Sequence, residues 1–300
     1  MVNSSDLLDP LFREAVTAID AGDMATLERL MAKHPRLLRD RLDTPGAWLR
    51  DNVGGAFDGF FQKPYLLWFV AEDPVRNGKL PRNIARVTRA IIQAAERAGV
   101  ESLPEQLDCA LQLVSWSWIA RECGVQIELI DVLVDAGASP DGNPENALVN
   151  GNFAAAEHLV QRGATLTLAT ALCLGRWGDV TRVADSASAR DRQFALALAA
   201  HSGRADALRQ VIDLGIDLNS PSPDLYSHAT ALHHAVGSGS LEAVKVLVET
   251  GANLSTRDTL WNGTPLGWAE HYRGEHQRDE RGRQYAEIAA YLRGKGAKDD

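Results

Sequence analysis

The sequence is poor in residues that would place it in several common classes of protein. Its 300 residues include three cysteines, Cys109, Cys123 and Cys173, which lie far apart within helical patterns. A small secreted domain held by disulfides would need a larger, even set, so we expect buried free thiols in a reducing, cytoplasmic compartment. Aromatic residues make up 6% of the chain. The core must therefore consist mainly of alanine, leucine and valine.

Long apolar runs and targeting signals are also missing. No run reaches the roughly 18 apolar residues that would cross a bilayer. The start, M-V-N-S-S-D-L-L-D, lacks the basic and apolar regions of a secretory signal. The net charge of −9 would repel a phosphate backbone. We therefore expect neither a membrane nor a nucleic acid as a partner.

The motifs of common enzymes are absent from the sequence. There is no G-x-S-x-G, no P-loop and no dinucleotide-binding glycine motif. The stretch H-Y-R-G-E-H, from His271 to His276, is one residue longer than the H-x-x-E-H zinc motif. His228, His233 and His234 lie close in sequence, but zinc needs three or four ligands that converge at about 2 Å. The sequence predicts no enzyme, no cofactor and no bound metal.

What the sequence does contain is a repeat. T-A-L-H-H-A-V-G begins at Thr230, and T-P-L-G-W-A begins at Thr264, about 34 residues later. The first copy has a capping threonine, a short helix, a glycine break and a second apolar helix that ends at Gly251. Such a unit buries its apolar face only by stacking on neighbours. Gly251, and Gly215 in an upstream copy, are predicted to have positive φ.

These residues resemble the ankyrin repeat family. Through 67–71, 124–138 and 261–269 the chain also resembles stand-alone bacterial ankyrin-repeat proteins of unassigned biochemical role. The resemblance implies an all-α fold, a right-handed ankyrin-type α-solenoid of stacked helix-turn-helix repeats with short or missing hairpins between the middle repeats. One domain over residues 1–300 is expected. Its approximate units are 10–38, 64–98, 107–140, 142–166, 169–190, 194–220, 230–256 and 264–298.

Two segments interrupt the repeat. Residues 41–63 hold a proline, several glycines and the pair Phe60-Phe61, and they predict a hairpin or loop with these rings exposed. Residues 274–284 are strongly charged and predict a solvated loop between the two helices of the last unit. Trp116 and Trp118 share a helical pattern with Ile119, so we expect both in the core.

The resemblance also implies a partner-binding face. In ankyrin repeats the first helices line a concave groove, and a histidine at the position of His233 bonds to threonine and to backbone. By position, the expected partner-binding residues are Arg176, Trp177, His201, Tyr226, His228, Trp261, His271, Tyr272 and Arg273. Aromatic and arginine side chains are enriched at binding hot spots. The alternative for Trp177 and Trp261 is packing between repeats.

The resulting hypothesis is a monomeric, non-catalytic protein-protein interaction module that binds a protein partner through the groove and the connecting loops. The alternative is an accessory or ligand-binding protein that encloses a peptide or small molecule in the groove or under residues 41–63. A hydrolase on an unusual scaffold is a third possibility. An open groove favours the first, and a closed pocket of several hundred Å³ lined by tryptophans favours the second.

Overall fold

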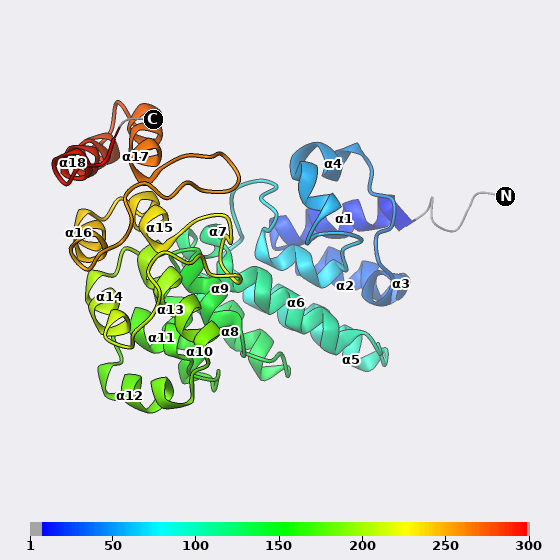
Figure 1. The fold of residues 1–300 in the computed structure, drawn as a ribbon. Coiled ribbons are helices and arrows are strands. Elements are labelled where there is room, and N and C mark those ends of the chain that lie inside the picture. The colour runs from blue at the N-terminus through cyan, green and yellow to red at the C-terminus, as the bar shows by residue number, and fades with distance from the viewer. Residues whose placement is uncertain (1–7, 299–300) are drawn as a thin grey trace. The chain divides into compact units, whose positions relative to one another are not determined.

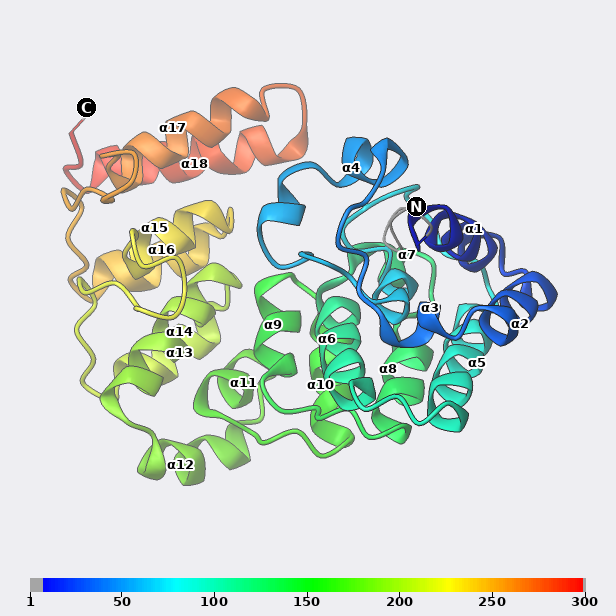
Figure 2. The ribbon, with the colours of Figure 1, turned by 90° about the vertical axis from the view of Figure 1, so that its right-hand side faces the viewer.

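The computed structural model describes residues 8–298, the side chain of Phe57 excepted, and within this range it contains helices and no strand (Figures 1 and 2). The predicted all-α fold is confirmed. The helices are α1 (Leu8–Ala21), α2 (Met24–Lys33), α3 (Arg36–Arg39), α4 (Ala47–Val53), η1 (Gly54–Asp58), η2 (Leu66–Ala71), α5 (Ile84–Arg97), α6 (Leu103–Trp116), α7 (Trp118–Glu122), α8 (Gln126–Asp135), α9 (Asn143–Val149), α10 (Phe153–Gln161), α11 (Leu168–Cys173), α12 (Trp177–Ser186), α13 (Ala189–His201), α14 (Ala205–Ile212), α15 (Ala231–Gly237), α16 (Leu241–Glu249), α17 (Pro265–Glu275) and α18 (Glu280–Gly294). Within residues 8–298, every helix is too short or too polar to cross a membrane.

The chain divides into two compact units, one that ends at Thr165 and one that begins at Leu166. The N-terminal unit is built from helix pairs in contact: α1 with α2, η2 with α5, α6 with α8, and α9 with α10. The first members of successive pairs contact one another, and so do the second members. The pairs therefore stack in two rows, as expected for units that cannot bury their apolar faces alone.

Helix α5 shows why these segments become helices. Ile84, Val87 and Ile91 are buried at helical spacing, whereas Arg86 and Arg89 on the other face are exposed. Such an amphipathic pattern turns one side of a helix toward the core and the other toward water. Each fully buried aliphatic side chain contributes about 1.5–3 kcal/mol relative to an exposed one. The packed face, more than intrinsic propensity, fixes this helix.

A buried charge network closes the loop after η2. The carboxylate of Glu72 accepts hydrogen bonds from the backbone N–H groups of Arg76 at 2.7 Å and Gly78 at 3.0 Å. The Arg76 guanidinium pairs with Glu72 at 3.0 Å and with Asp20 at 2.9 Å. Burial, with a smaller contribution from the nearby Glu72 carboxylate, raises the pKa of Asp73 to about 7 despite a hydrogen bond with Ser117 that lowers it. Arg76 thus pairs with two carboxylates, and Asp73 beside them takes up a proton near neutral pH.

The prediction for residues 41–63 was wrong for the hairpin and for Phe61, and it is confirmed for the exposed Phe60. The segment holds the helices α4 and η1 in place of a hairpin. Phe61 is fully buried, with its ring 5.4 Å from that of Phe69, while Phe60 is 52% exposed and lies 5.1 Å from the Trp116 ring. The two residues lie in the turn that follows η1, where neighbouring side chains point in different directions, so only one of the two phenylalanines enters the core.

The expectation that Trp118 belongs to the core was also wrong, because its side chain is 50% exposed. The cause is a break in the helical pattern at Ser117, whose backbone is extended between α6 and α7. The Ser117 hydroxyl accepts from the N–H of Ala120 at 3.1 Å and donates to the carbonyl of Ala71 at 2.8 Å. Ser117 thus starts α7 as a separate helix whose buried face is rotated relative to that of α6. Because of this rotation, Trp118 points toward solvent.

The C-terminal unit repeats the paired arrangement. Helix α11 contacts α12, α13 contacts α14, α15 contacts α16, and α17 contacts α18. Figure 2 shows α17 and α18 lying along one another. Ser188 caps α13 in a capping box with Asp191, and Thr264 caps α17 by accepting from the N–H of Gly267 at 3.0 Å. These caps satisfy N–H groups that have no partner inside the helix.

The predicted positive φ of the two stop glycines is confirmed. Gly215 has φ of +75° and Gly251 has φ of +101°. A Cβ at either position would meet no atom within 4 Å. The backbone conformation itself, and not lack of space, therefore favours glycine at these helix ends.

The predicted loop at residues 274–284 is mostly helical. Helix α17 continues to Glu275 and α18 begins at Glu280, so only residues 276–279 connect them. Asp279 caps α18 by accepting from the N–H of Gly282 at 3.2 Å. The charged residues form pairs at helical spacing, such as Glu280 with Arg283. Charge alone suggested a loop, but the spacing of these charges fits a solvated helix.

Two glycines of α18 provide a test of this corrected boundary. A Cβ at Gly282 would lie 2.2 Å from the carbonyl oxygen of His276, whereas a Cβ at Gly294 would meet nothing within 4 Å. We expect Gly282→Ala to lower the free energy of unfolding by about 1–3 kcal/mol through overpacking. Gly294→Ala should leave it unchanged or raise it by up to about 1 kcal/mol. Urea denaturation checks both, and equal effects would contradict the described start of α18.

Candidate protein-interaction surface

The connection between α16 and α17 is organised around one buried carboxylate. Asp258 Oδ1 accepts from the N–H groups of Leu260 at 2.9 Å and Trp261 at 2.6 Å. Its Oδ2 accepts from the N–H of Gly263 at 2.8 Å and from Nε1 of Trp268 at 2.9 Å. Burial opposes ionisation, but these hydrogen bonds outweigh it and lower the pKa of Asp258 to about 2. The turn is therefore held by a charged group at neutral pH, and it presents Leu260 and Trp261 to solvent.

A buried histidine ties this connection to α15. His233 Nδ1 accepts from the N–H of Thr230 at 3.3 Å and lies 2.9 Å from the Thr230 hydroxyl. The ring hydrogen is accordingly on Nε2, which donates to the carbonyl of Gly263 at 3.1 Å. Burial lowers the pKa of His233, so the ring is neutral. The structural role expected for His233 is confirmed.

Around this connection, aromatic and imidazole rings form a continuous series of contacts, here called the aromatic cluster. Tyr226 lies 5.5 Å from His201 and 6.3 Å from His228, between ring centroids. His228 lies 5.0 Å from Trp261. The series continues at 5.7 Å from Trp261 to Trp268, 6.2 Å from Trp268 to Tyr272 and 5.6 Å from Tyr272 to His271. The members of the aromatic cluster are His201, Tyr226, His228, His234, Trp261, Trp268, His271 and Tyr272.

The aromatic cluster combines projecting side chains with a hollow. Tyr226 is 53% exposed and Trp261 is 65% exposed. The hollow has a volume of about 430 Å³ and is lined by Trp261, Gly263, Gly267, Trp268, His271 and Tyr272. A Cβ at Gly263 would come within 3.1 Å of the Trp268 ring. The glycine therefore lets the connection approach the indole closely, which helps shape the hollow.

The structure brings together six of the nine residues that the sequence predicted for partner binding, namely His201, Tyr226, His228, Trp261, His271 and Tyr272. Arg176 and Trp177 lie at the start of α12, and Trp177 is 43% exposed. Arg273 is exposed and pairs with Glu270 at 2.5 Å. No ring contact recorded for the described residues joins Trp177 to the aromatic cluster. For all nine residues, a role in partner binding stays a prediction.

Sequence reasoning missed three residues that shape this surface. Trp268 lies four residues after the capping Thr264, and Asp258 lies six residues before it. His234, 3% exposed, lies 6.0 Å from the His201 ring and 6.1 Å from the Tyr226 ring. The tryptophan within T-P-L-G-W-A was a signal that more aromatic surface lay nearby. Nothing in the local pattern marks Asp258 as the centre of the turn.

The side chains of this surface are suited to non-covalent contacts with another molecule. Its rings provide stacking faces, and the N–H and hydroxyl groups at their edges can donate hydrogen bonds. Among residues 8–298, no three histidine, cysteine or carboxylate side chains are grouped so that they could hold a metal ion.

Comparison with known proteins finds a sequence family and a solved structure similar to this chain. Residues 147–258 match the family model described as ankyrin repeats in three copies. The solved ankyrin repeat domain of human ASB11 is similar at 17% sequence identity, with 72% of this chain and 96% of that chain covered and a TM-score of 0.36. A search of curated proteins finds no match to this sequence. The segment 147–258 is thus similar to the repeat family that the sequence pattern suggested. Trp261, Trp268 and Tyr272 lie beyond the matched residues.

Buried His234 gives this region a characteristic pH dependence. Burial, reinforced by the neighbouring His201, lowers its pKa to about 3. In the unfolded chain the pKa of His234 is about 6.5. Below that pH the unfolded chain therefore binds a proton at His234 that the native chain does not bind. Its contribution to stability is complete above about pH 6.5 and falls by about 1.4 kcal/mol per pH unit as the pH drops toward 3.

We therefore expect the free energy of unfolding of the wild type to fall more steeply between pH 6 and pH 4 than that of His234→Leu. Urea denaturation at several pH values measures the difference in slope. The same substitution at the exposed His271 serves as the control and should keep the wild-type slope. Parallel curves for the wild type and His234→Leu would show that His234 is protonated in the folded protein.

Proposed function

We propose that this chain is a non-catalytic protein-interaction module whose C-terminal unit binds a protein partner through the aromatic cluster. The observation that carries this proposal is the unbroken series of ring contacts that joins exposed Tyr226 and Trp261 to the 430 Å³ hollow. Tryptophan and tyrosine in and around a pocket are typical of binding hot spots. Ankyrin repeats, to which residues 147–258 are similar, are typically protein-protein interaction modules.

The hydrogen bonds beneath the aromatic cluster support a binding role. Asp258 and His233 fix the backbone that carries Trp261, so this side chain is presented from an ordered connection. Association costs less entropy when the contacting groups are already held in place. An exposed tryptophan on a well-anchored turn is therefore suited to insert into, or receive, a side chain of a partner.

The hollow also favours the alternative of an enclosed peptide. Trp261 and Trp268 supply two of its walls, and its volume fits one large side chain better than a folded surface. A partner that places one aromatic or aliphatic side chain there, with flanking contacts to Tyr226 and His201, satisfies both interpretations. The contacts of Arg176, Trp177 and Arg273, the monomeric state, the cytoplasmic location and the bacterial source stay predictions.

The proposal is tested by comparing partner capture for variants that differ in one exposed surface. The double variant Tyr226→Ala/Trp261→Ala should lose proteins that the wild type retains from a native lysate of the source cells. Each true hot spot should weaken binding to an identified partner by about 1 kcal/mol or more. Both side chains project from the unit, so the thermal midpoint should change little.

Trp118→Ala is the matched control, because Trp118 is 50% exposed but lies on α7 of the other unit. It should retain the same proteins as the wild type. Equal retention by the double variant, at equal yield and with intact folding, would contradict the proposed surface. Loss of folding in the double variant would instead show that these rings stabilise the unit, and the single variant Trp261→Ala then provides the binding comparison.

A further inference from the structure

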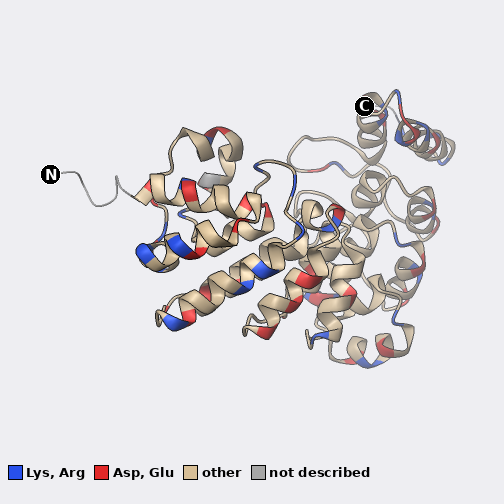
Figure 3. Ribbon diagram, turned by 180° about the vertical axis from the view of Figure 1, so that it is seen from behind, with Lys and Arg blue, Asp and Glu red and all other residues tan. Residues whose placement is uncertain are grey.

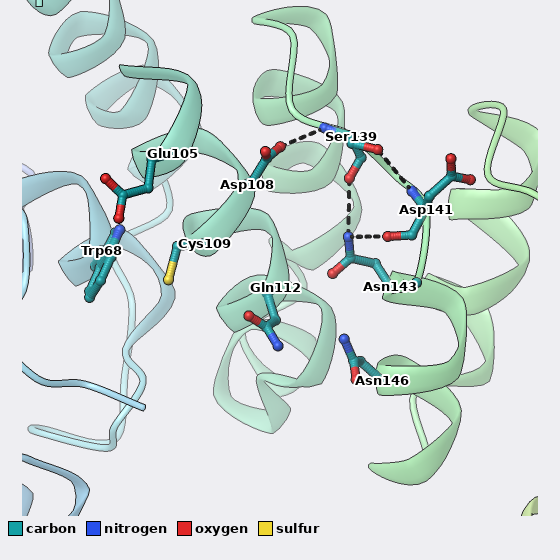
Figure 4. A pocket seen from close by; sticks show the side chains of 10 residues that line it. Trp68, Glu105, Asp108, Cys109, Gln112, Ser139, Asp141, Asn143 and Asn146 are labelled. Carbon is teal, nitrogen blue, oxygen red and sulfur yellow. Dashed lines mark hydrogen bonds between the residues drawn. The ribbon is translucent and has the colours of Figure 1, made fainter. Parts of the chain in front are cut away.

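The N-terminal unit contains a second hollow, here called the α6 groove. One face of α6 carries Glu105 and the residues three, four and seven positions after it, which are Asp108, Cys109 and Gln112. This face lines a hollow of about 780 Å³ (Figure 4). The opposite side comes from the turn before α9 and from α9 itself, and Trp68 of η2 lies at one end. The residues of that opposite side are Ser139, Asp141, Gly142, Asn143 and Asn146.

Two carboxylates in the α6 groove are anchored yet can still accept hydrogen bonds from a ligand. Asp108 Oδ1 accepts from the N–H of Ser139 at 2.8 Å, and Asp141 Oδ1 accepts from the N–H of Thr165 at 2.6 Å. The bond from Thr165 lowers the pKa of Asp141, which is therefore ionised. Within residues 8–298, Asp108 Oδ2 has no recorded hydrogen bond, while Asp141 also accepts from the Thr165 side chain and, on an exposed turn, still has lone pairs that can accept from a ligand. The groove thus offers negative charge at fixed positions.

The charge around the α6 groove is mostly acidic. The unit that ends at Thr165 has 23 Asp and Glu residues against 16 Lys and Arg residues. Neither α6 nor α8 contains a lysine or arginine, and Figure 3 shows helices of this unit that carry acidic residues alone. A cationic segment is favoured on such a surface, and an anionic one is repelled.

Uncharged polar groups are also available in the α6 groove. Figure 4 shows the side-chain amides of Gln112 and Asn146 turned toward one another from α6 and α9. Neither amide has a hydrogen bond recorded within the described part of the chain. Trp68 is 4% exposed, and its Nε1, turned toward Glu105 in Figure 4, has no hydrogen-bond partner there. Amides offer donors and acceptors together, which is the pattern that a peptide backbone requires.

One end of the α6 groove already holds a guanidinium from the chain itself. Arg41 pairs with Glu105, and its guanidinium carbon lies 4.2 Å from the centroid of the Tyr65 ring and 5.3 Å from that of Trp68. A carboxylate beside aromatic faces is a favourable site for arginine, which combines ion pairing with cation–π contact. The chain thereby shows which cation suits the adjoining surface.

The thiol in the α6 groove does not point to covalent chemistry. Burial, with smaller contributions from the nearby carboxylates, raises the pKa of Cys109 to about 11 although the nearby Arg41 lowers it. The thiol is therefore neutral at physiological pH, whereas a nucleophilic cysteine must be a thiolate.

We propose that the α6 groove binds an extended peptide segment that carries arginine. Its guanidinium groups pair with Asp108 and Asp141, and its backbone amides pair with Gln112 and Asn146. The proposal concerns the N-terminal unit and is independent of the aromatic cluster. Arginine suits it better than lysine, because a planar guanidinium can pair with a carboxylate and lie over an aromatic ring at the same time, as Arg41 does beside Tyr65 and Trp68.

The experiment is isothermal titration calorimetry of the full chain with the blocked peptide Ac-Ala-Arg-Ala-Arg-Ala-NH2. We expect saturable binding that weakens as salt rises. The same peptide with citrulline in place of arginine, which keeps the shape and loses the charge, should bind at least tenfold more weakly. Free argininamide should also bind at least tenfold more weakly, because it lacks the peptide backbone.

The double variant Asp108→Asn/Asp141→Asn keeps an oxygen for Ser139 and Thr165, so it removes charge while retaining the anchoring hydrogen bonds. It should weaken binding of the arginine peptide at least tenfold. Glu128→Gln on α8, which removes one charge outside the groove lining, should change it less than twofold. Absence of wild-type binding, equal binding of the citrulline peptide or of argininamide, or equal effects of the groove and control variants would each overturn the proposal.

Discussion

The hydrogen bonds that converge on Asp258 and Gly263 are the constraint on which the candidate surface depends. The Asp258 carboxylate receives three backbone N–H groups and the Trp268 indole, while the Gly263 carbonyl receives the His233 ring. A buried charge is costly unless it is fully hydrogen-bonded, and here the bonds outweigh the cost of burial, as the low pKa shows. Without this centre, the connection would have no fixed conformation in which to hold Trp261 outward.

The two units use different physical chemistry. The C-terminal unit gathers rings at its surface, where shape and desolvation favour a partner with apolar side chains. The N-terminal unit gathers carboxylates and amides along α6, where charge and directed hydrogen bonds favour an arginine-bearing segment. Each unit carries its own type of surface on similar stacked helix pairs. In this chain, as in repeat proteins generally, the stacking sets the scaffold and the exposed side chains set what is bound.

The parts of the structure that follow from short-range rules were predictable from the sequence. The helical pattern around Thr230 and the positive φ of Gly251 follow from capping and turn chemistry. The hydrogen-bonding role of His233 was expected from the resemblance to ankyrin repeats. The predictions for Trp118, Phe61 and residues 274–284 were wrong, because each depends on where one helix stops and the next begins. A single residue with an extended backbone, Ser117, changes which residues of the following helix, α7, point toward the core. Asp258 and Trp68 gain their roles from contacts that form only in the fold, Asp258 with the Trp268 indole and Trp68 with the Arg41 guanidinium, and local sequence patterns do not reveal such contacts.

The most direct test of the central claim is amide hydrogen exchange at Leu260, Trp261 and Gly263, measured by NMR in the wild type and in Asp258→Ala. If the Asp258 carboxylate holds the connection, these amides should exchange at least about tenfold more slowly than free peptide amides in the wild type. The substitution should remove that protection, while the amide of Leu247 in α16 stays protected. Wild-type exchange at the rate of free peptide amides would contradict the account, because the connection would then not be ordered by Asp258.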